Sequence, residues 1–316
     1  TSGGTEADNL AIKGIALGAP RGRHLVTTAI EHEAVRESAD YLRRHHGFEV
    51  TELPVDGEGR VSPDELAAAL RSGTTLVSIQ HADNEIGTVQ PIRELAAVAR
   101  AAGVPIHTDA VQSADALEVG LDALGVDAVS IAGHKLGAPK GIGALAVRGA
   151  LPLEPLLHGG GQERGRRSGT ENVAGVVGLA TAIALSALER PHRAHVREAR
   201  DTIIDGVLAR VPGAFLTGSR ADRLPNHASF CFPGTSGEAV LLELEARGIV
   251  CSSGSACAAG SDEPSPVLLA LGIAREVAQT AVRFTLPAEV TPAQAAEVVD
   301  RVVAAVAAVG GLDSRR

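Results

Sequence analysis

The chain has 316 residues, enough for one large domain and a smaller one around a substantial buried core. Hydrophobic residues make up 45% of it although Trp and Met are absent, so Ala, Val, Leu and Ile build the core, as suits a helix-covered parallel sheet. The formal net charge is −9, and no basic stripe with interleaved aromatic residues is present, which argues against direct binding of nucleic acid.

Helical and β-rich stretches alternate through the first half of the chain. Ser62 and Glu65 have the spacing of a capping box, and Pro91 suits the first turn of a helix. Such alternation predicts a doubly wound α/β domain, which binds ligands in the loops beyond its strand ends. The predicted strands span 25–28, 75–79, 105–108, 128–131 and 144–147, and the helical stretches include 62–70 and 91–102.

The second half opens with a long helical stretch over 171–189, which Pro191 interrupts. We therefore predict a large domain over 1–190 and a smaller C-terminal domain over 191–316. The smaller domain is predicted to contain helix 194–210, strand 228–232, helix 237–247 and a final helix 292–309.

Gly133-His134-Lys135 directly follows the predicted strand 128–131. A lysine at a buried strand end tends to lose its proton, because desolvating an ammonium group is costly. A neutral amine can form an imine with a carbonyl group. The alternative is a surface lysine in a flexible loop. The glycines that follow do not form a phosphate P-loop, since neither Ser nor Thr follows Lys140.

His107-Thr108-Asp109 closes another predicted strand, with Gln112 one turn further on. A carboxylate there can pair with a cationic ring nitrogen, the usual partner of a pyridoxal cofactor. Two alternatives remain open for Asp109. One is a cap of the following helix. The other is the His-x-Asp part of an iron site, which needs a distant histidine such as His158.

Three shorter features precede them. Ser2-Gly3-Gly4-Thr5-Glu6 opens a helix whose free N–H groups can hold a phosphate, although a plain N-cap explains it as well. His32 starts a helix after a strand, where an imidazole can stack on an aromatic cofactor and transfer protons, or be structural. Asn84 follows a third strand, where turn formation is the default interpretation.

Cys257 lies in a run of small residues from Cys251 to Gly260. A cysteine in such a run is expected to be exposed and able to carry a thiolate between a site and an external acceptor; the alternative is a loop cysteine without a role. Cys231 lies in an apolar strand and is predicted to be core, and Cys251 either ends a strand or belongs to the run. Three cysteines form no disulfide framework here, so we expect a reducing cytoplasm.

No apolar run approaches the length of a membrane span, so we expect no membrane association, and no signal peptide is visible. The chain starts at Thr1 inside what resembles an active-site loop. We therefore expect further residues before Thr1 in the whole protein.

The order of these motifs resembles the cysteine desulfurases of the NifS/IscS type, within the class V aminotransferase family. The resemblance extends over essentially the whole chain. The matching motifs are Thr-Ser-Gly-Gly-Thr-Glu-Ala-Asp-Asn-Leu-Ala-Ile (1–12), Glu-His-Glu-Ala-Val (31–35), Asn-Glu-Ile-Gly (84–87), Asp-Ala-Val-Gln-Ser (109–113), Gly-His-Lys (133–135), Pro-Lys-Gly-Ile-Gly-Ala-Leu (139–145), His-Gly-Gly-Gly-Gln-Glu-Arg (158–164), Arg-Ser-Gly-Thr (167–170) and Ser-Ser-Gly-Ser-Ala-Cys (252–257).

The resemblance implies a pyridoxal 5'-phosphate enzyme of fold type I, with a mainly parallel sheet, helices on both faces and a smaller α+β C-terminal domain. Lys135 would bind the cofactor covalently and later move the Cα proton, and Asp109 would face the pyridine nitrogen. Gln112 would face the ring hydroxyl, and His32 would stack on the ring and serve in acid–base steps.

The same resemblance assigns the phosphate and the substrate. Gly4, Thr5 and His134 would hold the phosphate, with Thr170 reaching across from the second subunit of a homodimer. Ala132 replaces a Ser found in many relatives, which removes one phosphate contact. Asn84 would contact the cofactor and, with Arg283, the substrate carboxylate, and Cys257 would accept the sulfur; no metal is implied.

The implied reaction converts L-cysteine to L-alanine and leaves a persulfide on Cys257. The persulfide would pass to an acceptor protein, an iron–sulfur scaffold or a tRNA-thiolation enzyme. Two alternatives stay open: another class V enzyme, such as a selenocysteine lyase or an aminotransferase, and a non-catalytic scaffold in a sulfur-transfer complex.

Overall fold

The computed structural model describes residues 1–18, 20–253 and 263–313, which form two compact units. Two short segments, Asp56–Arg60 and Asn84–Val89, belong to unit 2, although the sequence analysis assigned them to the N-terminal domain. Unit 1 comprises Thr1–Val55, Val61–Asp83 and Gln90–Arg190, and unit 2 adds Pro191–Arg316 to the two short segments.

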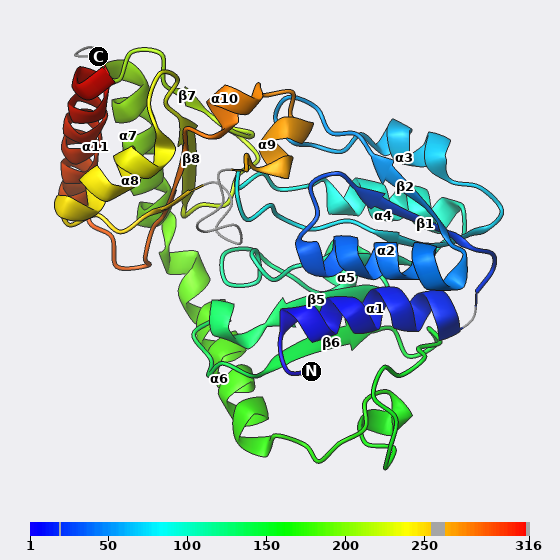
Figure 1. Ribbon diagram of the computed structural model, residues 1–316. Coiled ribbons are helices and arrows are strands. Elements are labelled where there is room, and N and C mark those ends of the chain that lie inside the picture. The colour runs from blue at the N-terminus through cyan, green and yellow to red at the C-terminus, as the bar shows by residue number, and fades with distance from the viewer. Residues whose placement is uncertain (19, 254–262, 314–316) are drawn as a thin grey trace. The chain divides into compact units, whose positions relative to one another are not determined.

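Unit 1 is built on a six-stranded sheet with the order β2-β1-β3-β4-β5-β6 (Figure 1). Neighbouring strands are parallel except β6, which runs antiparallel to β5. The predicted α/β class with a mainly parallel sheet is therefore confirmed. The strands are β1 (His24–Thr28), β2 (Glu49–Leu53), β3 (Thr74–Ser78), β4 (Ile106–Asp109), β5 (Ala128–Ala132) and β6 (Gly143–Val147).

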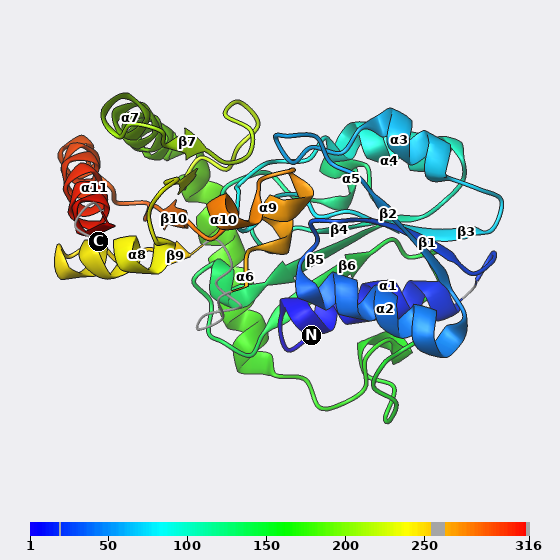
Figure 2. The same ribbon diagram turned by 45° about the horizontal axis from the view of Figure 1, so that its top comes forward.

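Helices cover both faces of this sheet. Alternate strand residues face opposite sides, so Leu25 packs among the side chains of α1 and α2, whereas Val26 packs among those of α3 and α4. Figure 2 shows α1 and α2 on one side of the strands and α3, α4 and α5 on the other. These helices are α1 (Gly4–Gly18), α2 (Glu33–His46), α3 (Pro63–Ala69), α4 (Ile92–Ala101) and α5 (Leu121–Leu124).

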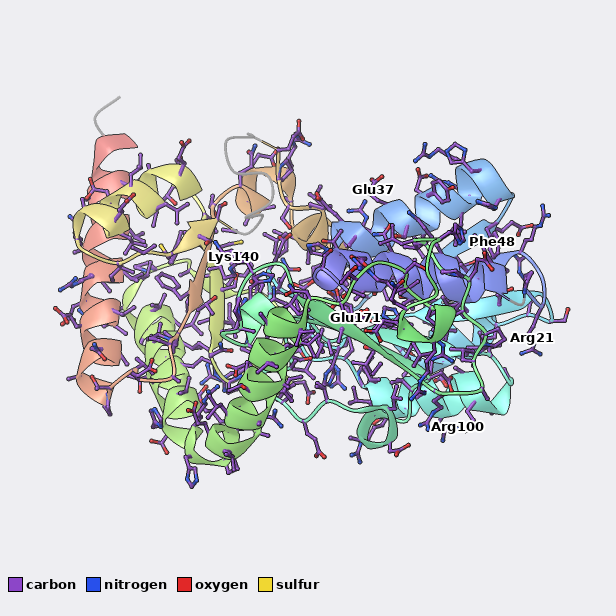
Figure 3. The ribbon with its side chains drawn as sticks, turned by 90° about the horizontal axis from the view of Figure 1, so that it is seen from below. Arg21, Glu37, Phe48, Arg100, Lys140 and Glu171 are labelled. Carbon is purple, nitrogen blue, oxygen red and sulfur yellow. The ribbon has the colours of Figure 1, made fainter. Side chains whose placement is uncertain are left out.

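Local sequence explains where these helices begin and end. The Ser62 hydroxyl accepts a hydrogen bond from the N–H of Asp64 at 3.2 Å and begins α3 with Pro63 in its first turn. Gly47 ends α2 in the left-handed conformation with φ of 66°, which costs glycine little. Phe48, labelled in Figure 3, follows at once and is buried against α1 and α2.

Helix α6 (Val173–Glu189) lies in unit 1 and is unusually apolar. Only a narrow stripe of it, including Leu179 and Ala182, is buried, against Ala138 and Ile142. The stretch Val173–His192 has the length and mean hydropathy of a possible membrane span, which is weak evidence by itself. The expectation that no apolar run approaches this length is therefore wrong.

Unit 2 contains a four-stranded antiparallel sheet with the order β7-β8-β10-β9. One face packs Phe230 and Phe284 against helices α7, α8 and α11, and the alternating residues Ser229 and Arg283 point to the other face. The strands are β7 (Phe215–Leu216), β8 (His227–Cys231), β9 (Ser252–Ser253) and β10 (Ala281–Thr285), and the helices are α7 (Ala194–Arg210), α8 (Gly237–Ala246), α9 (Pro266–Ala270), α10 (Arg275–Ala278) and α11 (Pro292–Asp313).

Candidate active site

Asp109 ends β4 and is buried, with 7% of its surface exposed. Its Oδ1 accepts a hydrogen bond from the N–H of Val111 at 2.8 Å. Burial raises the pKa of Asp109, and the hydrogen bond from Val111 and the charges of His32 and Lys135 oppose that rise. The structure therefore brings together three residues that the sequence places far apart.

Lys135 lies in the one-turn helix η1 (Gly133–Lys135), directly after β5. The sequence pattern predicts this lysine at a buried strand end, but both His134 and Lys135 are exposed. The physical reason is that the chain leaves β5 for the one-turn helix η1 at Gly133, so His134 and Lys135 are no longer part of the buried strand. Burial alone therefore does not account for a neutral amine at this position.

His32 is the N-cap of α2 and is half-buried. Its Nδ1 accepts a hydrogen bond from the N–H of Ala34 at 3.1 Å, and its carbonyl accepts from Val35 and Arg36. Because Nδ1 is an acceptor, the proton of the neutral ring lies on Nε2. His32 can therefore present Nε2 alone as a proton donor toward a ligand.

The N-terminus of α1 lies beside the ends of β4 and β5. A Cβ added to Gly4 would lie 2.8 Å from Cγ2 of Val111 and 3.3 Å from Cβ of Ala132, so only glycine fits without displacement. Thr1 and Gly143 exchange backbone hydrogen bonds of 3.1 and 2.9 Å, which fix the segment before Gly4. With 15 residues, α1 offers free N–H groups and a positive dipole end to an anion.

Glu6 in the first turn of α1 links this end to a distant segment. Nε of Arg167 donates to Oε1 of Glu6 at 2.8 Å, and the N–H of Ser2 donates to Oε2 at 2.9 Å. Burial opposes ionisation, but these hydrogen bonds prevail and lower the pKa of Glu6 to about 2. Arg167 therefore holds the 163–170 segment on α1, while Thr170 itself is exposed.

Gln112 and Thr5, two further predicted cofactor contacts, also lie in unit 1. Gln112 is half-buried in the turn that follows β4, and Thr5 is exposed in the first turn of α1. Ala132 is buried and leaves room for Gly4.

Asn84 and Arg283 lie in unit 2. Nη1 of Arg283, on β10, donates to the carbonyl of Asn84 at 2.7 Å. Arg283 is half-buried and stands opposite Ser229 of β8 and Ser252 of β9. The predicted substrate residues are therefore in mutual contact.

The described cysteines are unsuited to nucleophilic chemistry. Burial raises the pKa of Cys231 to about 11 and that of Cys251 to about 12, with Glu245 adding to the rise at Cys251. Cys231 is fully buried, as predicted for a core residue, and Cys251 packs against the unit 2 core. Cys257 lies outside the described residues.

The alternative of an iron site at His107 and Asp109 has no support in the hydrogen bonding. Both ring nitrogens of His107 are engaged, Nδ1 with the hydroxyl of Ser78 and Nε2 with that of Ser130, each at 2.9 Å. Among the described residues, no group of three or more His, Cys, Asp or Glu side chains is placed to hold a metal ion.

Two buried acids near Asp109 were missed by the sequence analysis. Glu31 accepts hydrogen bonds from the hydroxyl of Thr28 and the N–H of Gln80, and burial raises its pKa to about 8. Asp8, on the buried face of α1, is 1% exposed. The sequence did contain a signal for Asp8, which lies between Ala7 and Leu10 on the apolar side of a helix. An acidic residue is rarely buried at such a position without a partner, so its presence there is unusual.

The arrangement in unit 1 fits a defined kind of ligand. A glycine-lined helix N-terminus can hold an anionic group, a buried carboxylate can face a cation, and the Nε2–H of His32 and the amine of Lys135 can transfer protons near it.

Comparison with known proteins agrees with this geometry. The family model described as "Aminotransferase class-V" matches residues 1–298. "Cysteine desulfurase IscS" of Dictyoglomus turgidum is 48% identical over 288 residues, covering 90% of this chain and 73% of that protein. A protein of the same name from Methanosarcina thermophila is 47% identical, covering 90% of this chain and 71% of that protein. A solved structure titled "NIFS-LIKE PROTEIN" is 35% identical, with a TM-score of 0.88 over 97% of this chain and 81% of that chain.

Proposed function

This chain belongs to the aminotransferase class-V family, and we propose that it is a cysteine desulfurase that uses pyridoxal 5'-phosphate. The observation that carries the proposal is the grouping of His32, Asp109 and Lys135 in unit 1. The similarity to cysteine desulfurases over 90% of the chain supports the substrate L-cysteine.

The residues of unit 1 fit this cofactor. Gly4, Thr5 and His134 would hold its phosphate, because Gly4 keeps the N–H groups of α1 accessible and Thr5 and His134 are exposed. The Asp109 carboxylate would pair with the ring nitrogen, and Gln112 would face the ring hydroxyl. When bound, pyridoxal phosphate supplies an electron sink that stabilises negative charge at the substrate Cα.

The chain's own groups would then move protons and sulfur. The Lys135 amine would take the proton from Cα, and His32 would donate or accept a proton at Nε2. Arg283 and Asn84 would hold the substrate carboxylate, with the guanidinium already oriented by the Asn84 carbonyl.

Cys257 would carry the sulfur. Its thiolate would attack the sulfur of L-cysteine, so that a sulfur–sulfur bond forms while the carbon–sulfur bond breaks; the electron pair of the broken bond stays on the substrate Cβ, which takes a proton, leaving L-alanine and a Cys257 persulfide. The high pKa values of Cys231 and Cys251 support Cys257 as the acceptor. A thiolate of an acceptor protein, an iron–sulfur scaffold or a tRNA-thiolation enzyme, would then take the outer sulfur. This chemistry suits a cytoplasmic protein.

A homodimer is part of the proposal. Val173, Val177 and Leu188 on α6 are 68%, 60% and 70% exposed, and a second copy would remove this apolar surface from water. Thr170, just before α6, would reach the phosphate of the partner's site. The expected result is a dimer by light scattering, which Val177→Lys converts to a monomer; a monomeric parent would contradict it.

The decisive test combines labelling of Lys135 with product analysis. Borohydride treatment of the purified chain with cofactor should attach the cofactor to Lys135, as read by peptide mass. Incubation with L-cysteine should yield L-alanine; a keto acid would indicate an aminotransferase instead. Cys257→Ser should keep bound cofactor and abolish alanine formation, whereas the control Cys251→Ser should keep both. Full turnover by Cys257→Ser would refute the role of this thiol.

A further inference from the structure

Asp8 is a buried acid that interacts electrostatically with Asp109, the carboxylate proposed to face the cofactor ring. It lies in the second turn of α1 with 1% of its surface exposed. Among the described residues, its Oδ1 has no hydrogen-bond partner. A buried ionised carboxylate in such a position is strongly disfavoured.

A chain of hydrogen bonds connects Asp8 with the strands below it. The hydroxyl of Ser78 bonds to Nδ1 of His107, and the hydroxyl of Ser130 bonds to Nε2, each at 2.9 Å. Ser130 also hydrogen-bonds to the Asp8 carboxyl, and it is the register partner of Asp109 across β4 and β5. Ser130 therefore connects the two acids: its side chain bonds to Asp8, and its backbone pairs with Asp109 in the sheet.

The charges around Asp8 are unfavourable for its ionisation. Asp109 and Glu31 face it, and both carboxyl groups are buried. The described ion-pair candidate for Asp8 is His107, whose Nε2 lies 3.8 Å from Oδ1. Burial lowers the pKa of His107 to about 3, so this ring is neutral.

Asp109 differs from Asp8 in its surroundings, because the N–H of Val111 donates to it and the nearby Lys135 and His32 oppose the rise of its pKa. Two carboxyl groups close together in a buried site do not both ionise readily, and the proton remains on the one with the poorer environment. Of these two, that carboxyl group is Asp8.

We propose that Asp8 is held as an uncharged carboxylic acid and acts as a positioning residue for Asp109. Burial and the neighbouring acids keep the proton on Asp8 against the opposing hydrogen bond from Ser130, the register partner of Asp109, so that Asp109 is the carboxylate that ionises opposite a cationic ring. The role toward the ring rests on the proposed function, whereas the uncharged state of Asp8 does not.

The uncharged state is tested by unfolding the purified chain as a function of pH. Above the ordinary aspartate pKa of 3.8, the folded chain keeps a proton on Asp8 that the unfolded chain has released. The unfolding constant of the parent relative to Asp8→Asn should therefore rise about tenfold per pH unit. The control Asp64→Asn, at an exposed position of α3, should show no such rise. A ratio independent of pH would overturn the proposal.

Infrared difference spectra give an independent reading at neutral pH. The carbonyl band that Asp8 contributes should disappear in Asp8→Asn and persist in Asp64→Asn, while the band of protonated Glu31 persists in both variants. If Asp8→Asn removes no carbonyl band, Asp8 is ionised in the parent, as in an ion pair with His107, and the proposal is overturned.

Cofactor titration tests the positioning role. Asp8→Ala should weaken binding of pyridoxal phosphate, and Asp8→Asn, which keeps a neutral hydrogen-bonding group, should rescue it. An Asn variant as weak as the Ala variant would show that a negative charge is needed and would overturn the proposal. If the parent binds no cofactor, the proposed function fails, and the unfolding and infrared readings still decide the state of Asp8.

Discussion

The double role of His32 can be separated by two substitutions. In the structure, Nδ1 of His32 caps α2 through the N–H of Ala34, while Nε2 is available to a ligand. His32→Ala removes both functions. His32→Asn removes the ring but keeps a side-chain oxygen of the type preferred at N-caps.

The magnitudes differ for stability and activity. Loss of the cap in His32→Ala should lower the free energy of unfolding by about 1 kcal/mol, within a range of roughly 0.5–2 kcal/mol for such caps. His32→Asn should match the parent or exceed it, because Asn is among the best capping residues. Both variants should lose about 10²–10⁴-fold in the rate of alanine formation, the usual contribution of acid–base catalysis.

Urea unfolding and an alanine assay on the same preparations check this prediction. The expected pattern is one stable and one destabilised variant with similarly low activity. If His32→Asn is as unstable as His32→Ala, the capping argument is wrong. If His32→Asn turns over at the parent rate, the ring has no catalytic role.

Three further predictions concern unit 1 and the cysteines. Gly4→Ala should lower the free energy of unfolding by about 1–3 kcal/mol, because the new Cβ would lie 2.8 Å from Cγ2 of Val111. In the control Gly149→Ala, the new Cβ meets nothing within 4 Å. Equal urea midpoints for the two variants would contradict this prediction. Glu31→Gln should flatten the pH dependence of unfolding: Glu31 holds a proton in the folded state between its ordinary pKa of 4.5 and its folded pKa of about 8, so stability falls by about 1.4 kcal/mol per unit as pH rises through that window. An unchanged slope would show that Glu31 is ionised. Iodoacetamide near neutral pH should label Cys257 well before Cys251, whose pKa is about 12; equal rates by peptide mass would refute the assignment.

The regular elements of unit 1 follow from the sequence because their patterns are local. The strand predicted over 128–131 is β5, Ala128–Ala132, and the helix predicted over 91–102 is α4, Ile92–Ala101. Periodicity of two or 3.6 residues, together with Pro and Ser at helix starts, specifies such elements without knowledge of distant residues. The short β9, Ser252–Ser253, has no such pattern and depends on pairing with β10.

The residues of the candidate site were named from motifs, but their environments depend on the tertiary structure. Lys135 is exposed because the chain turns away from the sheet after β5, which a strand pattern does not reveal. The segment Asn84–Val89 lies in unit 2 although the residues on either side of it lie in unit 1, and the Arg283 guanidinium binds the carbonyl of Asn84 from 199 positions away.

The sequence by itself determined the α/β class and the order of the chemical groups, since both reside in short stretches of chain. Only the tertiary structure decided which of those groups share a buried, low-dielectric space. Asp8 illustrates the difference: its neighbours in sequence are ordinary helix residues, whereas its pKa is raised by burial and by Asp109, at the end of β4, and Glu31, in the loop between β1 and α2. Electrostatic interactions act through distance in space and not along the chain, so they remain undetermined until the fold has formed.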